Sequence, residues 1–434
     1  MMTRISNWSD LDDDARSALL QRPALRSDAK IGAEVARIVA LVRDNGDAAV
    51  RDLTEQFDGA TLGALRVTTE ELARATAELG DEAIAAIDLA IENVRRFHEP
   101  QLPQTIAVDT MPGVRCERVA HAIDSVGLYV PAGTAPLPSA AIMLAVPAAL
   151  ARCPTRIMCT PPRPDGSADP GVLVAASRAG IAEIFKIGGA QAIAAMAYGT
   201  QSLPKVCKIF GPGNAWVTNA KTLVSADPAG AAIDMPAGPS EVLVIADANA
   251  SADYVAADLL SQAEHGVDSQ VVLLTTSSDL ADQVQSKIDV QLRYLSRADI
   301  AREALSNSRL VVVDSIDRAI EISNRYAPEH LILQIDDPRG AMATIRNAGS
   351  VFLGAWSPES VGDYCSGTNH VLPTYGYAST YSGLGVDQFM RLMTVQELTR
   401  DGLVGLRDAV ITLADLEGLG AHAAAVRCRL GAST

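Results

Sequence analysis

The chain has 434 residues, of which 48% are apolar and 20% charged, so it can form roughly two to four domains with sizeable cores and is not a disordered protein. Its 36 basic and 52 acidic residues leave a net charge of −16. An acidic surface repels nucleic acids and anionic membranes, and it favours small cationic or zwitterionic substrates.

The sequence contains no sign of export or of membrane insertion. The first residues, MMTRISNWSDLDDD, are acidic and lack the apolar core of a signal peptide. The most apolar stretch, residues 140–150, is shorter than the roughly 20 residues that span a bilayer. We therefore expect a cytoplasmic protein that contacts neither a membrane nor nucleic acid.

The first hundred residues are predicted to be helical, because apolar residues recur at helical spacing over Ile31 to Arg43 and over Glu70 to Phe97. From Ser125 onward, short runs rich in branched apolar residues alternate with Ala-rich helical stretches. This pattern is typical of parallel sheets covered on both faces. A first set of runs occupies residues 126–130, 156–160, 183–187 and 206–210, and a second set occupies 241–246, 270–275, 309–313, 331–335 and 350–353.

Two successive units of similar rhythm predict two Rossmann-like, doubly wound parallel-sheet domains that are duplicated, with small helical extensions at both ends of the chain. The duplication is inferred from rhythm alone, since no residue-level repeat is visible. The tail, residues 403–430, is helical with breaks at Gly418 and Gly420. It is too small to fold alone and must pack on its own core or on a partner subunit.

Histidine gives the best indication of chemistry, because the chain has only six. His265 ends a helix, and Gln262 lies three residues earlier on the same helix face. Imidazole nitrogen and amide oxygen can bind a divalent metal such as zinc. On this segment alone the simpler explanation is a histidine that interacts with the negative end of the helix dipole.

Glu329 and His330 lie in the turn RYAPEHLILQI, between a helix stopped by Pro328 and the next predicted strand. A neutral imidazole is the usual general base near neutral pH, and a neighbouring carboxylate can orient water or take a second proton. The alternative is a surface turn that happens to carry two polar residues.

Two further segments carry possible ligands. Asp363 and His370 lie in the loop ESVGDYCSGTNHVLPT, whose glycines allow polar side chains to converge; otherwise this is a solvated loop. Glu417 and His422 lie in LEGLGAHAAAV. His422 falls in the first turn of the last helix, where a cation is disfavoured, so a neutral histidine that binds a metal is expected.

The chain lacks the GxGxxG fingerprint of dinucleotide binding, but three glycine-bearing turns link predicted strands to helices: VPAGTAPLPS, GGAQA and GPGNAWVTNAK. Free N–H groups at such helix starts can hold a pyrophosphate at the carboxyl ends of the strands. Together with the metal and base candidates, these turns fit an alcohol dehydrogenase. They also fit a metal-dependent hydrolase or a metal-binding module without catalysis.

Eight segments, in order and spacing, resemble the motifs of the histidinol dehydrogenase family: GLYVPAGTAPLPS, KIGGAQAIAAMAYGT, KIFGPGNAWVTNAK, DMPAGPSEVLVIAD, DLLSQAEHGVDSQ, APEHLIL, GDYCSGTNHVLPT and EGLGAHA. The similarity runs from about residue 30 to 430 and is strongest to proteobacterial members. It implies oxidation of L-histidinol to L-histidine through histidinaldehyde, with NAD as the oxidant and one zinc per subunit. A paralogous dehydrogenase for another polar alcohol remains the alternative within this class.

The resemblance also implies roles for individual residues. His330 is the expected base for the alcohol proton, and Glu329 is expected to activate water for the aldehyde step. The expected zinc ligands, which also hold the substrate, are Gln262, His265, Asp363 and His422. Ser240, His330, His370 and Glu417 match further substrate-binding positions, and Tyr129, Gln191 and Asn214 match NAD-binding positions.

The family forms homodimers with exchanged segments, so the resemblance implies that the tail of one subunit reaches the site of the other. On this basis we expect residues 26–110 and 240–380 to form a first α/β domain with the metal and base motifs. Residues 111–239 are expected to form a second, NAD-binding domain, and residues 1–25 with 381–400 a small extension. Residues 401–434 are expected to be a helical tail that packs on the partner.

Overall fold

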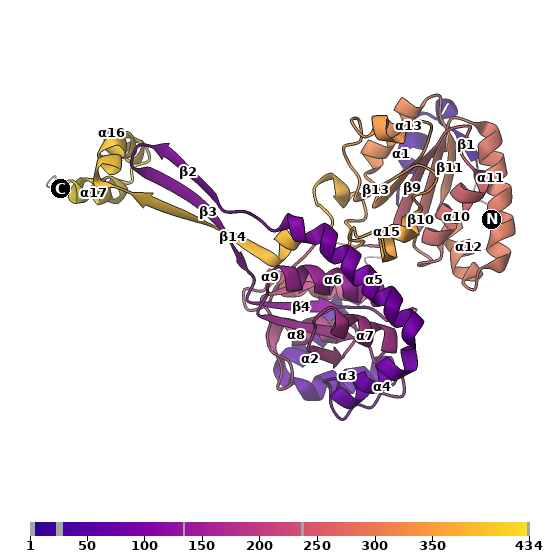
Figure 1. The fold of residues 1–434 in the computed structure, drawn as a ribbon, viewed down its shortest axis with the longest axis horizontal. Coiled ribbons are helices and arrows are strands. Elements are labelled where there is room, and N and C mark those ends of the chain that lie inside the picture. Colours follow the sequence, from indigo (N-terminus) through magenta and orange to yellow (C-terminus); the bar gives the residue numbers. More distant parts are fainter. Residues whose placement is uncertain (1–4, 23–28, 133–134, 236–237, 432–434) are drawn as a thin grey trace.

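The computed structural model describes residues 5–22, 29–132, 135–235 and 238–431. They form two α/β lobes and a long arm that projects from them (Figure 1). The C-terminus lies at the end of the arm and the N-terminus on the far lobe. None of the helices in the described part of the chain is long and apolar enough to cross a membrane.

Lobe 1 is built on a parallel sheet with the strand order β6-β5-β4-β7-β8. Its strands are β4 (Ser125–Tyr129), β5 (Thr155–Thr160), β6 (Glu183–Lys186), β7 (Lys208–Phe210) and β8 (Ala232–Ile233). Val126 and Leu128 enter the core on one face of the sheet, whereas Tyr129 enters the core on the other. Both faces are buried, which explains why these strands are continuous apolar runs.

Helices cover both faces of this sheet. On one face lie α6 (Pro138–Leu150) and α7 (Pro170–Arg178), and on the other lie α8 (Gly189–Tyr198) and α9 (Ala215–Ala226).

Lobe 2 repeats this architecture. Its parallel sheet has the order β1-β11-β10-β9-β12-β13, so the five strands from β9 to β13 follow the same order as those of lobe 1. The strands are β1 (Ile5–Asn7), β9 (Glu241–Ala246), β10 (Gln270–Thr275), β11 (Arg309–Val312), β12 (His330–Gln334) and β13 (Ser350–Leu353). The predicted pair of doubly wound domains is therefore confirmed.

The helices of lobe 2 again lie on both sides of the sheet. One face is covered by α10 (Ala252–Ala263), α11 (Ser278–Gln291) and α12 (Ala298–Ser306), and the other by α13 (Ile316–Tyr326) with the N-terminal α1 (Asp13–Leu19). Short helices α14 (Pro338–Ala341) and α15 (Glu359–Tyr364) flank β13.

The helices between residues 29 and 98 pack on lobe 1, so the grouping of residues 26–110 with 240–380 is wrong. They are α2 (Ala29–Asn45), α3 (Asp47–Asp58), α4 (Thr69–Leu79) and α5 (Asp81–His98). The apolar side chains of α2 and α3 join the core beside α8 and α9, and those of α4 and α5 join the core beside α6 and α7. The expected helix over Glu70 to Phe97 is two helices, because Gly80 adopts φ +77° between them.

The expected small extension of residues 1–25 with 381–400 is also wrong. β1 pairs with β11 and is the edge strand of lobe 2. β14 (Met390–Leu398) instead pairs with β3 (Val114–Ala122), which pairs with β2 (Ile106–Met111). These three antiparallel strands form the arm. The strand β3 therefore belongs to the arm and not to the lobe 1 sheet, although it was expected in the domain of residues 111–239.

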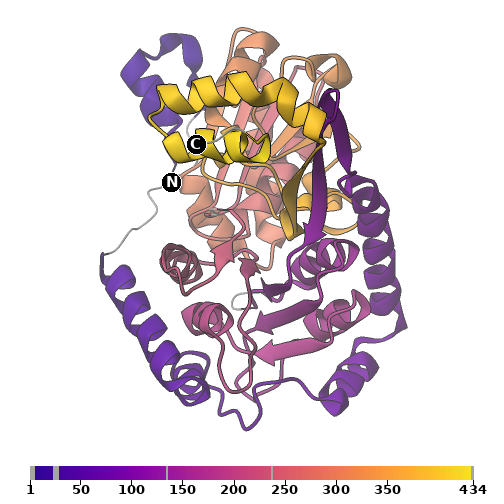
Figure 2. The same ribbon diagram turned by 90° about the vertical axis from the view of Figure 1, so that its left-hand side faces the viewer.

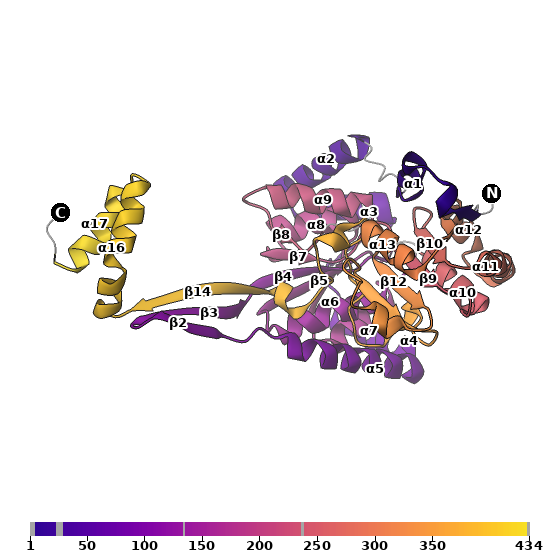
Figure 3. The same ribbon diagram turned by 90° about the horizontal axis from the view of Figure 1, so that it is seen from above.

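The arm ends in two helices, α16 (Arg400–Leu416) and α17 (Gly420–Arg429), which lie far from both lobes (Figures 1 and 3). Figure 2 looks along the arm and shows these helices in front of the lobes. All six residues of β2 are exposed, so the arm strands lack the buried apolar runs by which the other strands were predicted.

Candidate active site

The predicted site residues of the two lobes lie together between the two sheets. Each lobe presents the opposite edge of its sheet to this site. Tyr129 is the last residue of β4. Gln191 lies in the first turn of α8, the helix after β6, and Asn214 immediately precedes α9, the helix after β7. Lobe 1 therefore contributes the carboxyl ends of its strands. Ser240 precedes β9, and His330 begins β12, so lobe 2 contributes the amino ends of its strands.

A cavity of about 970 Å³ lies along the edge of lobe 1 and is lined by all three predicted NAD-binding residues, Tyr129, Gln191 and Asn214. Asn214 caps α9, because its Oδ1 accepts hydrogen bonds from the N–H groups of Trp216 and Val217 at 3.1 and 3.2 Å. The Tyr129 hydroxyl accepts a hydrogen bond of 3.0 Å from the N–H of Gly189. Residues 133 and 134 of the first expected turn lie outside the described residues.

A smaller cavity of about 110 Å³ adjoins the first and shares Ser240 and His265 with it. This cavity is lined by residues that were predicted to bind the metal, to act as base or to bind the substrate, from lobe 2 and from the segment after β13. They are Ser240, Gln262, His265, Glu329, His330, Asp363 and His370. Asp363 and His370 were expected in one loop; Asp363 instead lies on the short helix α15.

Three buried polar atoms around the small cavity have no hydrogen-bond partner among the described residues: Gln262 Oε1, His330 Nε2 and His370 Nε2. An unpaired buried polar atom is costly, so most such atoms in folded proteins have partners. Three of them in one cavity indicate a binding site whose ligand supplies the missing interactions.

His330 is held among acidic and amide groups. Its Nδ1 lies 2.8 Å from Gln262 Nε2, 3.2 Å from the backbone oxygen of Glu241 and 3.6 Å from Glu329 Oε2. Its Nε2 lies 3.7 Å from Asp363 Oδ1. Burial alone would lower the pKa of His330, but nearby carboxylates, Glu329 first, outweigh burial and raise that pKa to about 10.

Three side chains can hold a cation beside the small cavity, which two of them, His265 and Asp363, line. Ligand atoms of His265, Glu359 and Asp363 lie within 4.8 Å of one another. Burial raises the pKa of Glu359 well above its usual range, and the Ser261 hydroxyl donates a hydrogen bond of 2.9 Å to its carboxylate. Zinc accepts ligands of this kind, namely imidazole nitrogen and carboxylate or amide oxygen. The donor set therefore fits the expected zinc.

Glu359 is not among the residues predicted from the sequence. A signal is present, because Glu359 precedes Asp363 by four residues and this spacing places two side chains on one face of a helix. The glycines of the segment predict a loop, however, and on a loop the spacing carries no such meaning.

Glu417 and His422 are not brought to the site within one chain. Glu417 caps the end of α16 and His422 lies in the first turn of α17, as expected for His422, but both are exposed on the arm. One chain thus brings together three of the four predicted zinc ligands.

Comparisons with known proteins show the family of this chain. The family model for histidinol dehydrogenase matches residues 20–430. The histidinol dehydrogenase of Xanthomonas oryzae is 54% identical over 428 residues, which cover 99% of each chain. That of Photobacterium profundum is 55% identical over 423 residues, with 98% of this chain and 95% of the relative covered.

A crystal structure of histidinol dehydrogenase from Elizabethkingia anophelis matches this fold with a TM-score of 0.94 and 45% identity, over 99% of this chain and 98% of that chain. Fold, family model and full-length identity agree. The chain therefore belongs to the histidinol dehydrogenase family of oxidoreductases.

Proposed function

We propose that this protein oxidises L-histidinol to L-histidine in two steps through histidinaldehyde, with NAD and one zinc ion per subunit, as the final reaction of histidine biosynthesis. The main support is the small cavity with unpaired Gln262, His330 and His370 atoms, which adjoins the larger cavity lined by the NAD-binding candidates. This arrangement would place an alcohol carbon of a small substrate between a base and a hydride acceptor.

The residues that would hold the zinc are Gln262, His265 and Asp363, completed by His422 of a second copy. When bound, NAD supplies the hydride acceptor, and the zinc anchors the substrate through its imidazole and amino groups. Ser240 and His370, which line the same cavity, would contact the substrate directly, as would Glu417 from the second copy.

His330 would accept the alcohol proton through Nε2, the ring atom that faces the cavity without a partner. This requires the proton to sit on Nδ1, from which the backbone oxygen of Glu241, 3.2 Å away, can accept a hydrogen bond. The Gln262 amide would then have to turn its Nε2, a donor that lies 2.8 Å from Nδ1, away from the ring. The imidazole would become neutral, and so able to act as a base, once the charge of the bound cation offsets the surrounding carboxylates.

Glu329 would activate the water that hydrates the aldehyde before the second oxidation. Its carboxyl group is buried next to His330, and burial raises its pKa. A carboxylate with a raised pKa is a stronger proton acceptor than one in water, which suits a general base.

We further propose that two copies form a dimer by exchanging their arms. The support is that Glu417 and His422 match site positions but lie on an arm away from the lobes (Figure 1). The arm helix α16 also exposes large apolar side chains: Leu413 is 60% exposed and Leu416 is 79% exposed. A partner subunit would cover such a surface.

Incubation of the purified protein with L-histidinol and NAD tests the reaction, with NADH followed by absorbance. We expect two NADH per histidinol, loss of the activity on chelation and its return with zinc. A hydrolase would instead turn over substrate without NAD. Activity with other amino or polyhydroxy alcohols but not with histidinol would indicate a paralogous dehydrogenase.

Mixed dimers test the exchanged arm. Subunits carrying His330→Gln and subunits carrying His422→Ala are each expected to be nearly inactive, but a mixed dimer would hold one intact site. Coexpression in equal amounts should restore roughly a quarter of the wild-type activity. If each site is built from one chain, the mixture stays as inactive as its parents.

A further inference from the structure

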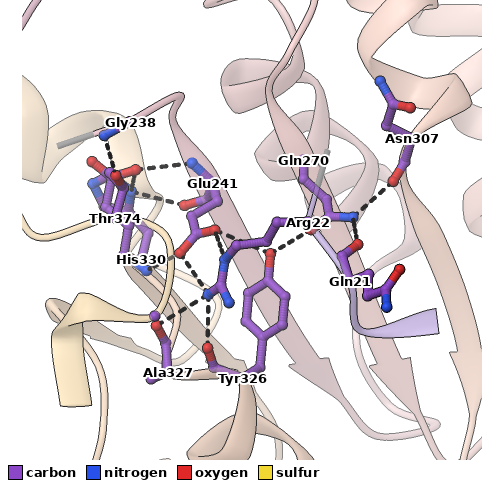
Figure 4. Close-up of polar contacts among 12 residues, drawn as sticks. Gln21, Arg22, Gly238, Glu241, Gln270, Asn307, Tyr326, Ala327, His330 and Thr374 are labelled. Atoms are coloured by element: carbon purple, nitrogen blue, oxygen red, sulfur yellow. Dashed lines mark hydrogen bonds and ion pairs between the residues drawn. The ribbon is translucent and has the colours of Figure 1, made fainter. Parts of the chain in front are cut away.

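Arg22, the last described residue before α2, lies at the amino edge of the lobe 2 sheet (Figure 4). Its Nε and Nη2 donate hydrogen bonds of 2.6 and 2.9 Å to the two carboxylate oxygens of Glu241. This bidentate ion pair is almost fully enclosed, since the side chain of Glu241 is 2% exposed and that of Arg22 is 15% exposed. Geometry of this kind is specific to the planar guanidinium group.

Arg22 also binds the C-terminal end of α13, which leads into the turn that carries Glu329 and His330. Its Nη2 donates to the backbone oxygens of Tyr326 at 2.7 Å and Ala327 at 3.3 Å, and its guanidinium lies over the Tyr326 ring at 3.8 Å. Ala327 adopts φ +51°, a left-handed conformation that is strained for a residue with a side chain. Contacts that satisfy the carbonyl groups of this turn therefore help to keep it in place.

Glu241 in turn holds the two catalytic candidates. Its N–H donates a hydrogen bond of 2.8 Å to Glu329 Oε2, and its carboxylate accepts a hydrogen bond of 3.2 Å from the N–H of Glu329. Its backbone oxygen lies 3.2 Å from His330 Nδ1. One residue thus orients the Glu329 carboxylate and the turn backbone, and its backbone oxygen can accept a hydrogen bond from a protonated His330 Nδ1.

The Tyr326 hydroxyl completes the network, because it donates to Gln270 Oε1 at 2.8 Å and lies 3.2 Å from Glu241 Oε2. Gln270 Nε2 donates to the backbone oxygens of Asn307 and Gln21. The segment that carries Arg22 is therefore tied to β9 through Glu241, to β10 through Gln270 and to the end of α13 (Figure 4).

We propose that Arg22 is a positioning residue of the active site, which acts through Glu241 to hold Glu329 and His330 in their reactive geometry. It touches none of the reacting groups itself. The inference rests on the proposed function, since it assigns Arg22 to the machinery of that reaction. Displacement of a reacting group by about 1 Å can cost on the order of 100-fold in rate, so a network of this kind should act mainly on kcat.

The test compares Arg22→Gln and Arg22→Lys with the wild-type holoenzyme, all loaded with zinc. We expect Arg22→Gln to lower kcat by about 10- to 100-fold while KM for histidinol and zinc content stay within about twofold. Arg22→Lys keeps the charge but loses the bidentate geometry, so it should fold like the wild type and recover only part of the kcat.

Arg325→Gln is the matched control. Arg325 also ties the N-terminal segment to α13, through a hydrogen bond of 3.0 Å to Ser17 Oγ, but it is exposed and does not contact Glu241. This variant should keep wild-type kcat and KM. If it lost as much kcat as Arg22→Gln, general loosening of the segment would explain both effects and the inference would be wrong.

A folded Arg22→Gln with kcat within twofold of the wild type, or with raised KM and unchanged kcat, would overturn the inference. If Arg22→Gln does not fold, Arg22→Lys decides: reduced kcat with unchanged KM supports positioning, and unchanged kcat contradicts it. A wild type that does not oxidise histidinol contradicts the proposed function instead. In that case crystal structures of the wild type and of Arg22→Lys still test the network. A Glu329 carboxylate and a His330 ring that occupy the same positions in both structures would overturn the inference.

Discussion

The two lobes share one strand order but offer opposite edges of their sheets to the site. Lobe 1 contributes the carboxyl ends of its strands, where open α/β sheets usually bind ligands. Lobe 2 contributes the amino ends. A shared topology therefore does not imply a shared location of the site, and function depends on the side chains at each edge.

The difference between the edges has an electrostatic consequence. At the carboxyl edge of lobe 1, α8 and α9 present their N-terminal ends, where free N–H groups and the positive end of the helix dipole favour an anion such as a pyrophosphate. At the amino edge of lobe 2, α10 presents its C-terminal end beside Gln262 and His265, and the negative end of a helix dipole favours a cation. The two edges thus offer complementary surroundings, one for an anion and one for a cation.

The largest expected effect comes from lobe 2. His330→Gln should lower the rates of both oxidations by about 10²–10⁴-fold, as is typical for loss of a general base. Binding of NAD, measured by fluorescence titration, should be unchanged because lobe 1 is intact. Wild-type rates in this variant would show that His330 is not the base.

Glu329→Gln should separate the two oxidation steps. We expect the aldehyde step to slow by about 10²-fold, within the usual range for general base loss, while the alcohol step slows less. The two steps can be measured separately with histidinol and with histidinaldehyde as the starting substrate. Equal losses in both steps would remove the distinction between the roles of Glu329 and His330.

In lobe 1, Asn214→Ala should act on NAD rather than on histidinol. Loss of the cap on α9 should cost about 1 kcal/mol of stability and raise KM for NAD several-fold, with KM for histidinol unchanged. Asn219→Ala is the control, because Asn219 lies on the same helix and its side chain donates a hydrogen bond to the backbone oxygen of Ala215, one turn earlier, rather than capping the helix. An effect on histidinol alone would place the cofactor elsewhere.

The smallest expected effect is a pH dependence of stability in lobe 1. His98 is fully buried on α5, its Nδ1 lies 2.8 Å from the backbone oxygen of Val94, and burial lowers its pKa. The unfolded chain therefore binds a proton more readily, so this contribution to stability is present above about pH 6.5 and is lost as the pH falls below it.

Urea unfolding of the wild type and of His98→Gln between pH 7.5 and 5 measures this contribution. The wild type should lose more of its stability than the variant as the pH falls. Parallel curves for the two proteins would mean that His98 does not contribute to the pH dependence.

The sequence by itself determined the local features of this protein. Nine strands of the two sheets, all but β1 and β8, lie close to their predicted positions, because strands buried on both faces must be continuous apolar runs. The glycine-bearing turns after β6 and β7 were predicted by composition. Gln262 and His265 were predicted to share a helix face, but α10 ends at Ala263, so His265 lies in the turn that follows the helix. Residue-level roles came from family motifs, which also reflect local sequence.

Only the tertiary structure decided which distant surfaces meet. Helices α2 to α5 are amphipathic, and such a pattern shows that a face is buried but not on which sheet it packs. The arm strands are exposed, so burial left no pattern in them. Arg22 and Glu241 are 219 residues apart, and their pairing depends on complementary shape and charge between segments whose separation in sequence carries no information about contact.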